Sequence, residues 1–200
     1  MKINFNFWNR IFQVRYFKIP NAPVSGYTSR TTDGYHVLFL DYDMKNPEII
    51  FADLMNLFKD KVISHAYIFT TFEQEDELGK VGNYHVVCLD RFRYYEILKI
   101  MELTHCDTLH KELAKKTRYG SWVLRFSGKG ERKEPLFVKF IPNPNKKVSH
   151  IQSMAHYKLL HILYPDLKDE FKFNFDGLKE TIVTQYNTAS KLNENAVKNG

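Results

Sequence analysis

The segment GYHVLFLDYD, residues 34–43, constrains the fold most, because an apolar run rich in β-forming residues ends there in two aspartates. Successive side chains of a strand point to opposite faces, so Asp41 and Asp43 share one face and Tyr42 lies on the other. A strand often ends in one aspartate because Asp favours turns. Two carboxylates on one face repel each other unless a cation lies between them, and oxygen ligands suit Mg²⁺ or Mn²⁺. The pair therefore predicts a metal site.

The composition favours one domain, or one domain with an appendage, in a chain of 200 residues of which 44% are hydrophobic. The formal charge of +6 favours nucleic acid, nucleotides or other anionic surfaces as partners. Cys88 and Cys106 lie in apolar or helical contexts without a pairing pattern, which is typical of reduced cysteines in a cytoplasmic protein. We expect no membrane partner, because no apolar run approaches the roughly 20 residues of a spanning helix.

Hydrophobic periodicity and turn residues predict the elements after residue 34. We expect a helix that begins at Asn46-Pro47, a helix at 91–105 that 109–116 extends, and an acidic hairpin loop at 73–83. Strands are expected at 35–42, 64–72, 84–89, 121–126 and 135–141. This order, β-α-β-β-α-β with one additional strand, predicts an α+β fold with a ferredoxin-like or RRM-like split βαβ core. In that core an antiparallel sheet carries the helices on one face and leaves the other face open.

Three parts are expected along the chain. Residues 1–33 hold one or two N-terminal strands within 4–19 and a polar loop at 20–33. Residues 34–148 form the RRM-like core, and residues 149–200 form a C-terminal extension with helices at 150–164 and 178–192.

A histidine is expected beside the two aspartates. In the split βαβ core the first and third strands are the central, adjacent pair and run antiparallel, so the end of the first faces the start of the third. His85 lies at the start of the third strand, in GKVGNYHVV, residues 79–87. A strand histidine can also simply face solvent, but this position predicts a site that joins Asp41, Asp43 and His85.

A basic cluster follows in RFSGKGERK, residues 125–133. The backbone amides of a Gly-rich turn, together with Arg125, Lys129 and Arg132, suit a triphosphate or a phosphodiester. The spacing is not that of a P-loop, and a solvated basic loop is the alternative. Arg125 also interrupts an apolar strand, so we expect it on the open face or paired with a carboxylate. Arg30, in the polar loop, is a weaker candidate for phosphate binding.

The segments FLDYD and GKVGNYHVV, with a later strand and basic loop, resemble the archaeo-eukaryotic primase superfamily over roughly residues 34–140. That family includes the primase-polymerases of plasmids and viruses and the polymerase domains of bacterial end-joining ligases, and its core is RRM-like. The resemblance implies that Asp41 and Asp43 bind the divalent metals and that His85 contacts the nucleotide's phosphates. It departs from the family at the third motif, where Arg125 occupies the strand that should carry an acid. The candidates to replace that acid are Asp90, Glu131 and Glu134.

The resemblance implies a template-dependent nucleotidyl transferase, a primase, a DNA polymerase or both, that uses Mg²⁺ or Mn²⁺ in replication or repair of a plasmid, virus or other mobile element. Its partners would be single-stranded or primed nucleic acid, nucleoside triphosphates, and a helicase or accessory domain. Two ions would hold the attacking hydroxyl and the triphosphate in line. Aromatic residues on the open face would stack bases, with Tyr35, Tyr84 and Trp122 as candidates.

Two other classes of protein remain open. A non-catalytic RRM-like module would bind single-stranded nucleic acid through its sheet, although the sequence has no RNP-type run. A HAD-like phosphatase also has a strand-terminal DxD, and Thr70 or Thr71 would be its second motif. The expected order of elements lacks the repeated parallel units of that fold.

Overall fold

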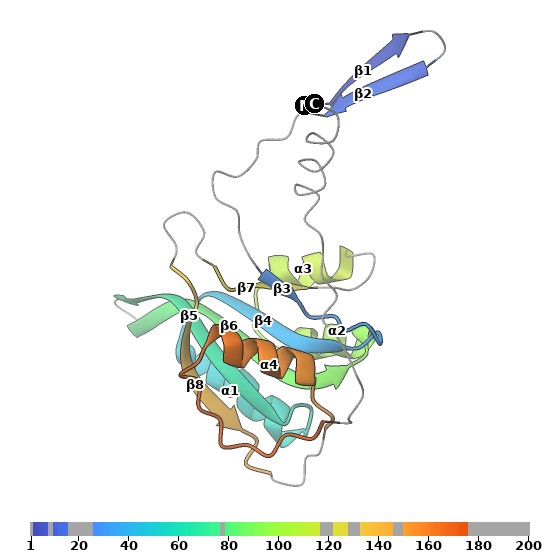
Figure 1. Cartoon of the computed structure of the whole chain (residues 1–200). Coiled ribbons are helices and arrows are strands. Elements are labelled where there is room, and N and C mark those ends of the chain that lie inside the picture. The colour runs from blue at the N-terminus through green and yellow to red at the C-terminus, as the bar shows by residue number, and fades with distance from the viewer. Residues whose placement is uncertain are drawn as a thin grey trace. The chain divides into compact units, whose positions relative to one another are not determined.

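The computed structural model describes residues 2–7, 10–15, 26–76, 79–116, 122–127, 133–145 and 150–175 (Figure 1). The chain divides into two compact units, one of which spans 24–185. The other unit contains an antiparallel hairpin of β1 (Lys2–Phe7) and β2 (Arg10–Arg15), which confirms strands in the N-terminal region. The larger unit combines a four-stranded antiparallel sheet with four helices, as expected of an α+β fold.

The sheet has the strand order β4-β6-β5-β8, and every neighbouring pair is antiparallel. Its strands are β4 (His36–Lys45), β5 (His65–Asp76), β6 (Gly79–Phe92) and β8 (Leu136–Pro142). The expected adjacency of the first and third strands, β4 and β6, is confirmed. The expectation that β4 is central is wrong, because β8 pairs with β5 at the far edge instead of with β4.

Other groups occupy the outer edge of β4. The backbone N–H of Val37 donates to the carbonyl of Ser29, and the N–H of Asp107 donates to the carbonyl of Asp41 at 2.7 Å. Nε2 of His110 lies 3.2 Å from the carbonyl oxygen of Phe39, which can only accept a hydrogen bond. These contacts use backbone groups that a neighbouring strand would need, which explains why β8 lies elsewhere.

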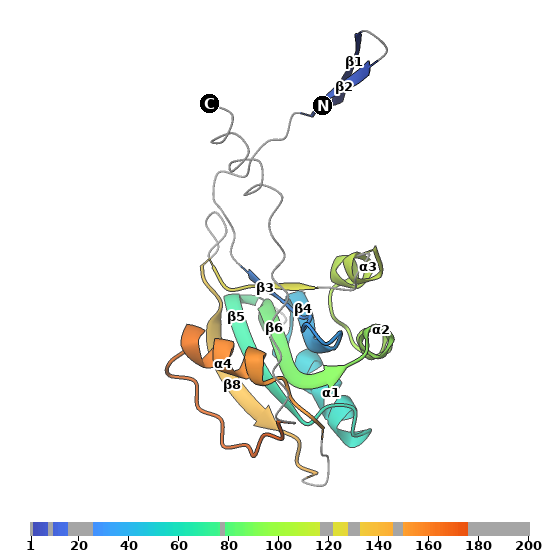
Figure 2. The ribbon, with the colours of Figure 1, turned by 45° about the vertical axis from the view of Figure 1, so that its right-hand side comes forward.

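Helices cover both faces of the sheet. Helix α1 (Pro47–Lys59) begins as predicted, with the Asn46 side chain accepting from the N–H of Glu48. Figure 2 shows α1 and α2 (Tyr94–Glu102) on one side of the sheet and α4 (Met154–Leu163) on the other. The side chains of β4 agree, since Tyr42 donates to Asp53 of α1 whereas Phe39 contacts His156 of α4. The two helices of the expected core thus share one face, as predicted, but the expectation that the other face is open is wrong, because α4 covers it.

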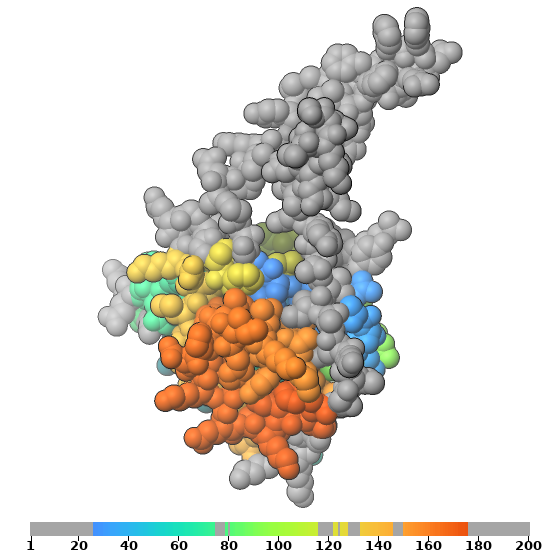
Figure 3. Space-filling view, viewed as in Figure 1, coloured from blue at the N-terminus to red at the C-terminus, as the bar shows by residue number. Residues whose placement is uncertain are grey.

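Helix α4 and the segment that follows it, residues 164–175, form much of the face seen in Figure 3. Asp169 ties this segment down, because it accepts hydrogen bonds from the Tyr67 hydroxyl and lies 3.2 Å from Nε2 of His161. Phe171 and Phe173 pack on the His65 ring, with centroids 5.2 Å away. The N-terminal half of the predicted extension thus covers the face that the sequence left open.

Several element boundaries also differ from expectation. The predicted hairpin between β5 and β6 is confirmed, but its loop is shorter than 73–83, because β5 continues to Asp76 and β6 begins at Gly79. Strand β7 (Val123–Arg125) pairs with β3 (Gly26–Thr28) in a separate two-stranded sheet. The predicted extension at 109–116 is helix α3 (Thr108–Lys116), and the helix expected at 178–192 lies outside the described residues. In the part of the chain that is described, no helix has the length and apolar character needed to cross a bilayer.

Candidate functional site

Asp41 and His85 lie directly opposite each other on β4 and β6. The carbonyl of Asp41 points away from β6, toward the N–H of Asp107, so this is a non-hydrogen-bonded pair, the kind in which side chains come closest. His85 Nε2 lies 3.4 Å from Asp41 Oδ1, and the two side chains are 10% and 31% exposed. The structure therefore brings together the histidine and the first aspartate that the sequence singled out.

Asp43 lies at an irregularity of β4. The register with β6 shifts between Tyr42 and Lys45, and Met44 has a φ of 50°, in the left-handed region. The N–H of Met44 donates to the side-chain oxygen of Asn83 at 2.9 Å, which holds this conformation. The bulge ends the regular strand beside the exposed Asp43 carboxylate, and bulges commonly re-aim side chains next to active sites.

His85 is neutral at pH 7. Burial lowers its pKa to about 4, and the nearby Arg125 and His110 side chains act in the same direction. The Asp43 carboxylate acts in the opposite direction and raises the pKa of His85, so it also lies within electrostatic range of the imidazole. His85 Nδ1 is buried and has no hydrogen-bond partner among the described residues. A neutral imidazole carries one donor and one acceptor nitrogen, and here Nε2 is the nitrogen that faces the carboxylate of Asp41.

A cavity of about 720 Å³ adjoins Asp43. Its walls come from β4, β5, β6 and the segment that leads into β8. The lining includes Asp43, Thr70, Thr71, Asn83, Lys133 and Glu134. Carboxylates, hydroxyls, an amide and an ammonium group therefore converge on a space large enough for a nucleotide-sized ligand.

Arg125, at the end of β7, is half-buried and supports the base of the basic loop. Its Nη1 donates to the carbonyl of Ser127 at 2.5 Å and to that of Lys133 at 3.5 Å. Ser127 and Lys133 flank residues 128–132, so Arg125 joins the two ends of that loop. Its charge also reaches His85 and Tyr164. The expected pairing of Arg125 with a carboxylate stays a prediction, because its hydrogen bonds described here go to backbone carbonyls.

The other predicted phosphate-binding residues do not join the site in the same way. Arg30 forms an isolated antiparallel β-bridge with His36, at the start of β4. His36 lies five residues before Asp41 on that strand. At the rise of a strand this separation is about 17 Å, so Arg30 lies away from the carboxylate site, and its role in phosphate binding stays a prediction. Lys129 and Arg132 lie outside the described residues, and so does Glu131.

Asp90 is not the missing third acid. It lies five residues beyond His85 on β6, is fully buried, and accepts hydrogen bonds from Ser64 and from Gln152. These donors explain a structural role, in which one carboxylate joins three segments of the chain. Glu134 lines the same cavity as Asp43 and is the remaining described candidate.

His65, Cys88 and Asp90 form a second cluster whose ligand atoms lie within 4.8 Å of one another. All three residues are buried. His65 Nε2 already accepts from the N–H of Leu89 at 3.0 Å, and Nδ1 lies 2.8 Å from Ser64 Oγ. Burial raises the pKa of the Cys88 thiol. The cluster is accounted for as a hydrogen-bonded polar core, and its mixed donors differ from the oxygen ligands that Mg²⁺ prefers.

The aromatic residues proposed to stack bases are not on an open face. Trp122 and Tyr84 are buried, and the Tyr84 hydroxyl donates to Glu73 at 2.7 Å. Tyr35 lies beneath the guanidinium groups of Arg91 and Arg93. Packing in the core explains the first two residues, as it does for most strand aromatics.

Sequence reasoning missed the residues that hold the edge of the site. His110 and Asp107 both bond to β4, and Asp107 Oδ1 also accepts from the N–H of His110, three residues later. An aspartate three residues before a bonded N–H is an N-cap signal, and CDTLH at 106–110 carried it. That signal predicts the start of α3 but not its position beside the metal-binding candidates.

The residues present fit a divalent metal. Asp41 and Asp43 supply hard carboxylate oxygens at a partly exposed strand end, and the neighbouring cavity leaves room for water ligands. Two such carboxylates lie two residues apart on β4, and Glu134 lines the cavity together with Asp43. Mg²⁺ commonly uses only one or two protein carboxylates together with substrate phosphates.

Comparison with protein-family models, with curated proteins and with solved structures gave no match.

Proposed function

We propose that this chain is a template-dependent nucleotidyl transferase of the primase–polymerase type, with an RRM-like catalytic core. The observation that carries the proposal is the cross-strand pair of Asp41 and His85, with Asp43 two residues further along β4. Two carboxylates and a neutral imidazole beside a cavity of about 720 Å³ are a suitable set for a metal-bound nucleoside triphosphate. The protein would act in the cytoplasm on single-stranded or primed nucleic acid.

Each residue has a role that follows from its position. Asp41 and Asp43 would hold Mg²⁺ or Mn²⁺, and that ion supplies charge stabilisation at the reacting phosphate. His85, neutral at pH 7, would donate a hydrogen bond to a phosphate oxygen without adding a charge. Lys133, on the cavity wall, would neutralise the triphosphate. Arg125 would position the loop at 128–132, whose Lys129 and Arg132 are further phosphate-binding candidates.

Two features separate this chain from the family that it resembles. The strand β7 carries Arg125 where an acid is expected, and β8 pairs with β5. Glu134, from the segment before β8, would replace the acid from a different element. The fully antiparallel sheet argues against a HAD-like phosphatase, whose fold requires parallel strands. A non-catalytic nucleic-acid-binding module is the second candidate, favoured by the absence of an acid on β7.

Primer extension tests the proposal directly. The purified protein is given a labelled primer on a template with dNTPs and Mn²⁺, and, separately, an unprimed template with NTPs. Wild type should lengthen the primer or make new chains, whereas Asp41→Ala should not. His85→Ala should mainly raise the KM for nucleotide, because a phosphate contact is lost from the ground and transition states alike. No product under either condition, with retained nucleic-acid binding, would favour the non-catalytic module.

Metal binding is tested separately by calorimetry with Mn²⁺. The double variant Asp41→Ala/Asp43→Ala should lose binding and keep its fold, because both groups are partly or fully exposed. Asp60→Ala/Asp166→Ala removes two exposed carboxylates elsewhere and serves as the control for total charge. Equal binding by both double variants would remove Asp41 and Asp43 from the metal site.

A further inference from the structure

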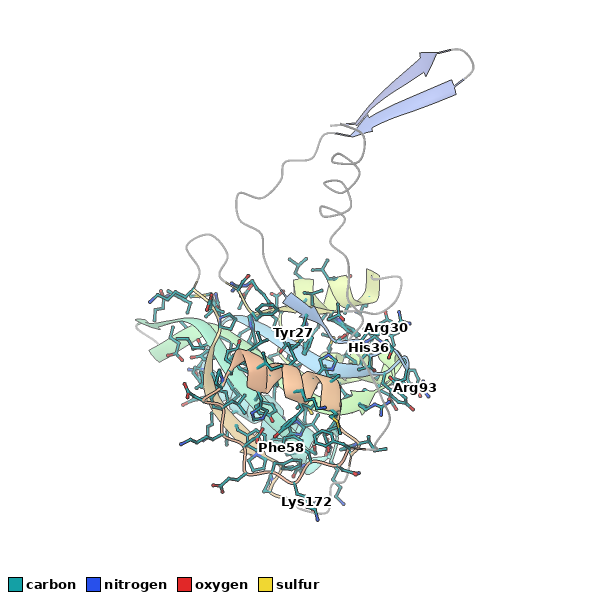
Figure 4. All side chains as sticks on the ribbon, viewed as in Figure 1. Tyr27, Arg30, His36, Phe58, Arg93 and Lys172 are labelled. Carbon is teal, nitrogen blue, oxygen red and sulfur yellow. The ribbon has the colours of Figure 1, made fainter. Side chains whose placement is uncertain are left out.

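A cluster of arginines surrounds Tyr35 at the start of β4. The guanidinium carbons of Arg91 and Arg93 lie 4.4 Å and 4.1 Å from the centroid of the Tyr35 ring. Arg30 bridges His36, the next residue along the chain, and its charge contributes to the low pKa of that histidine. Figure 4 shows Arg30 and Arg93 on the same side of the molecule as His36, with Lys172 at the opposite end. We call Arg30, Tyr35, Arg91 and Arg93 the arginine surface.

The arginine surface has an inner and an outer layer. The Arg91 side chain is only 5% exposed and forms an ion pair with Asp33. This pair neutralises the buried charge and fixes Arg91 against Tyr35. Arg93 is exposed and Arg30 is half-buried, so their two positive charges are the ones that an incoming molecule meets. The outer layer therefore presents two guanidinium groups beside a ring that Arg91 and Asp33 hold in place.

Stacking on an aromatic ring prepares a guanidinium for phosphate binding. The ring contacts the flat face of the group, while its N–H donors lie in the plane and remain directed outward from that face. Two such donors can hold a phosphate in a bidentate arrangement. Because Tyr35 restricts Arg93, less side-chain entropy is lost when an anion binds. Two like charges near one ring also repel each other, and a bound anion relieves that repulsion.

The arginine surface is separate from the carboxylate site. His36 and Asp41 are five residues apart on β4, which corresponds to about 17 Å along the strand. A single triphosphate is too short to contact both places. A stacked nucleic-acid strand advances about 3.4 Å per nucleotide, so a segment of about five nucleotides spans the distance. The chemistry that matches both the spacing and the charge is an extended polyanion.

We propose that the arginine surface binds the phosphodiester backbone of single-stranded nucleic acid at a distance from the carboxylate site. The choice of nucleic acid among polyanions rests on the proposed function. The surface has no base-reading role, since Tyr35 is covered by two guanidinium groups. Its contribution is independent of sequence and depends strongly on salt, as backbone contacts do.

Fluorescence anisotropy with a labelled 12-nucleotide oligothymidine, measured between 50 and 200 mM NaCl, tests this proposal. For single strands each lost phosphate contact reduces the slope of log K against log salt by about 0.7, so Arg30→Gln/Arg93→Gln should reduce it by about 1.4. The affinity advantage of wild type over this variant should shrink about sevenfold across that salt range. Lys168→Gln/Lys172→Gln makes the same change in charge on exposed residues of the 165–175 segment and should leave the slope unchanged.

Three results would overturn the proposal. The first is an equal change in slope for both double variants, and the second is no oligonucleotide binding by wild type. The third is that Arg30→Gln/Arg93→Gln loses binding to phosphatidylserine vesicles but keeps its binding to the oligonucleotide. Arg30→Lys/Arg93→Lys keeps the charge and should retain the slope while losing part of the affinity, because lysine lacks the bidentate fork. Circular dichroism checks that each variant is folded. If primer extension fails and the difference in slope remains, the proposed enzyme activity is wrong and the binding surface stands.

Discussion

Three buried histidines outside the candidate site make the folded state sensitive to mild acid. Burial lowers the pKa of His36, His65 and His156 from 6.5 to about 4. Desolvation is the main cause for all three, and each ring also has fixed neighbours. His65 Nε2 accepts from the N–H of Leu89, and His156 Nε2 lies 2.8 Å from the Thr28 carbonyl while Nδ1 faces Ser153 Oγ.

The sign of the effect follows from the direction of these shifts. A histidine with a lowered pKa in the folded state stays neutral there, while the unfolded chain takes up a proton below pH 6.5. Stability is therefore fully present above pH 6.5 and is lost as the pH falls toward 4. Each histidine costs about 1.4 kcal/mol per pH unit in this window, or about 2 kcal/mol at pH 5. The three together cost about 6 kcal/mol, comparable with the whole stability of a small domain.

Urea denaturation followed by circular dichroism at pH 8 and pH 5 measures this loss. His156→Gln should lose stability at both pH values because hydrogen bonds are lost, but the difference between the two pH values should shrink by about 2 kcal/mol. The measurement at pH 8 is thus the internal control for the substitution. A free energy of unfolding that stays constant between pH 8 and pH 5 in wild type would refute the reasoning. An unchanged pH difference in His156→Gln would exclude that histidine.

Three further predictions concern the surroundings of the site. Tyr42→Phe removes one hydrogen bond from the buried Asp53 carboxylate and should cost about 1 kcal/mol in urea denaturation; no change would show that Asp53 is satisfied without it. Gly82→Ala places a Cβ 2.5 Å from the carbonyl oxygen of Phe72 and should cost about 1–3 kcal/mol, whereas an unaffected melting curve would contradict this contact. Lys129→Gln/Arg132→Gln should weaken the binding of a nucleoside triphosphate measured by calorimetry. Unchanged affinity would mean that the basic segment 125–133 is a solvated surface without a role in binding.

The pairing of Asp41 with His85 could be predicted from sequence because it depends on local rules. The side-chain period of two fixes which residues of β4 share a face, and the split βαβ order places β6 beside β4. The helix start at Asn46 was equally local, since a cap and a following proline define it. These features need no knowledge of distant contacts.

The parts that could not be predicted depend on tertiary competition. The edge of β4 could accept either β8 or the segment around Asp107, and only the packing of α3 decides between them. Helix α4 lies on the second face because His156 and Tyr164 pack against Phe39 and Phe69, residues that any covering element could have used. The position of Arg30, away from the carboxylate site, could not be predicted because a charged loop residue carries no local signal for the end of the strand that it approaches.

The two edges of the sheet differ in their resistance to intermolecular strand addition. Strand β4 has the composition of an aggregation-prone segment, apolar and aromatic, and an exposed edge with that sequence could recruit another chain. The N–H of Asp107 and the ring of His110 block this edge.

Strand β8 lies at the opposite edge, where Leu136 and Val138 are exposed. A register irregularity near Val138, an exposed Lys139 and the terminal Pro142 interrupt it, and each of these discourages edge-to-edge pairing. Segment 105–110 therefore also protects the colloidal stability of the protein. Removal of this segment would expose the edge of β4, an aggregation-prone strand, to pairing with another chain. The opposite edge, at β8, is already protected by its own sequence.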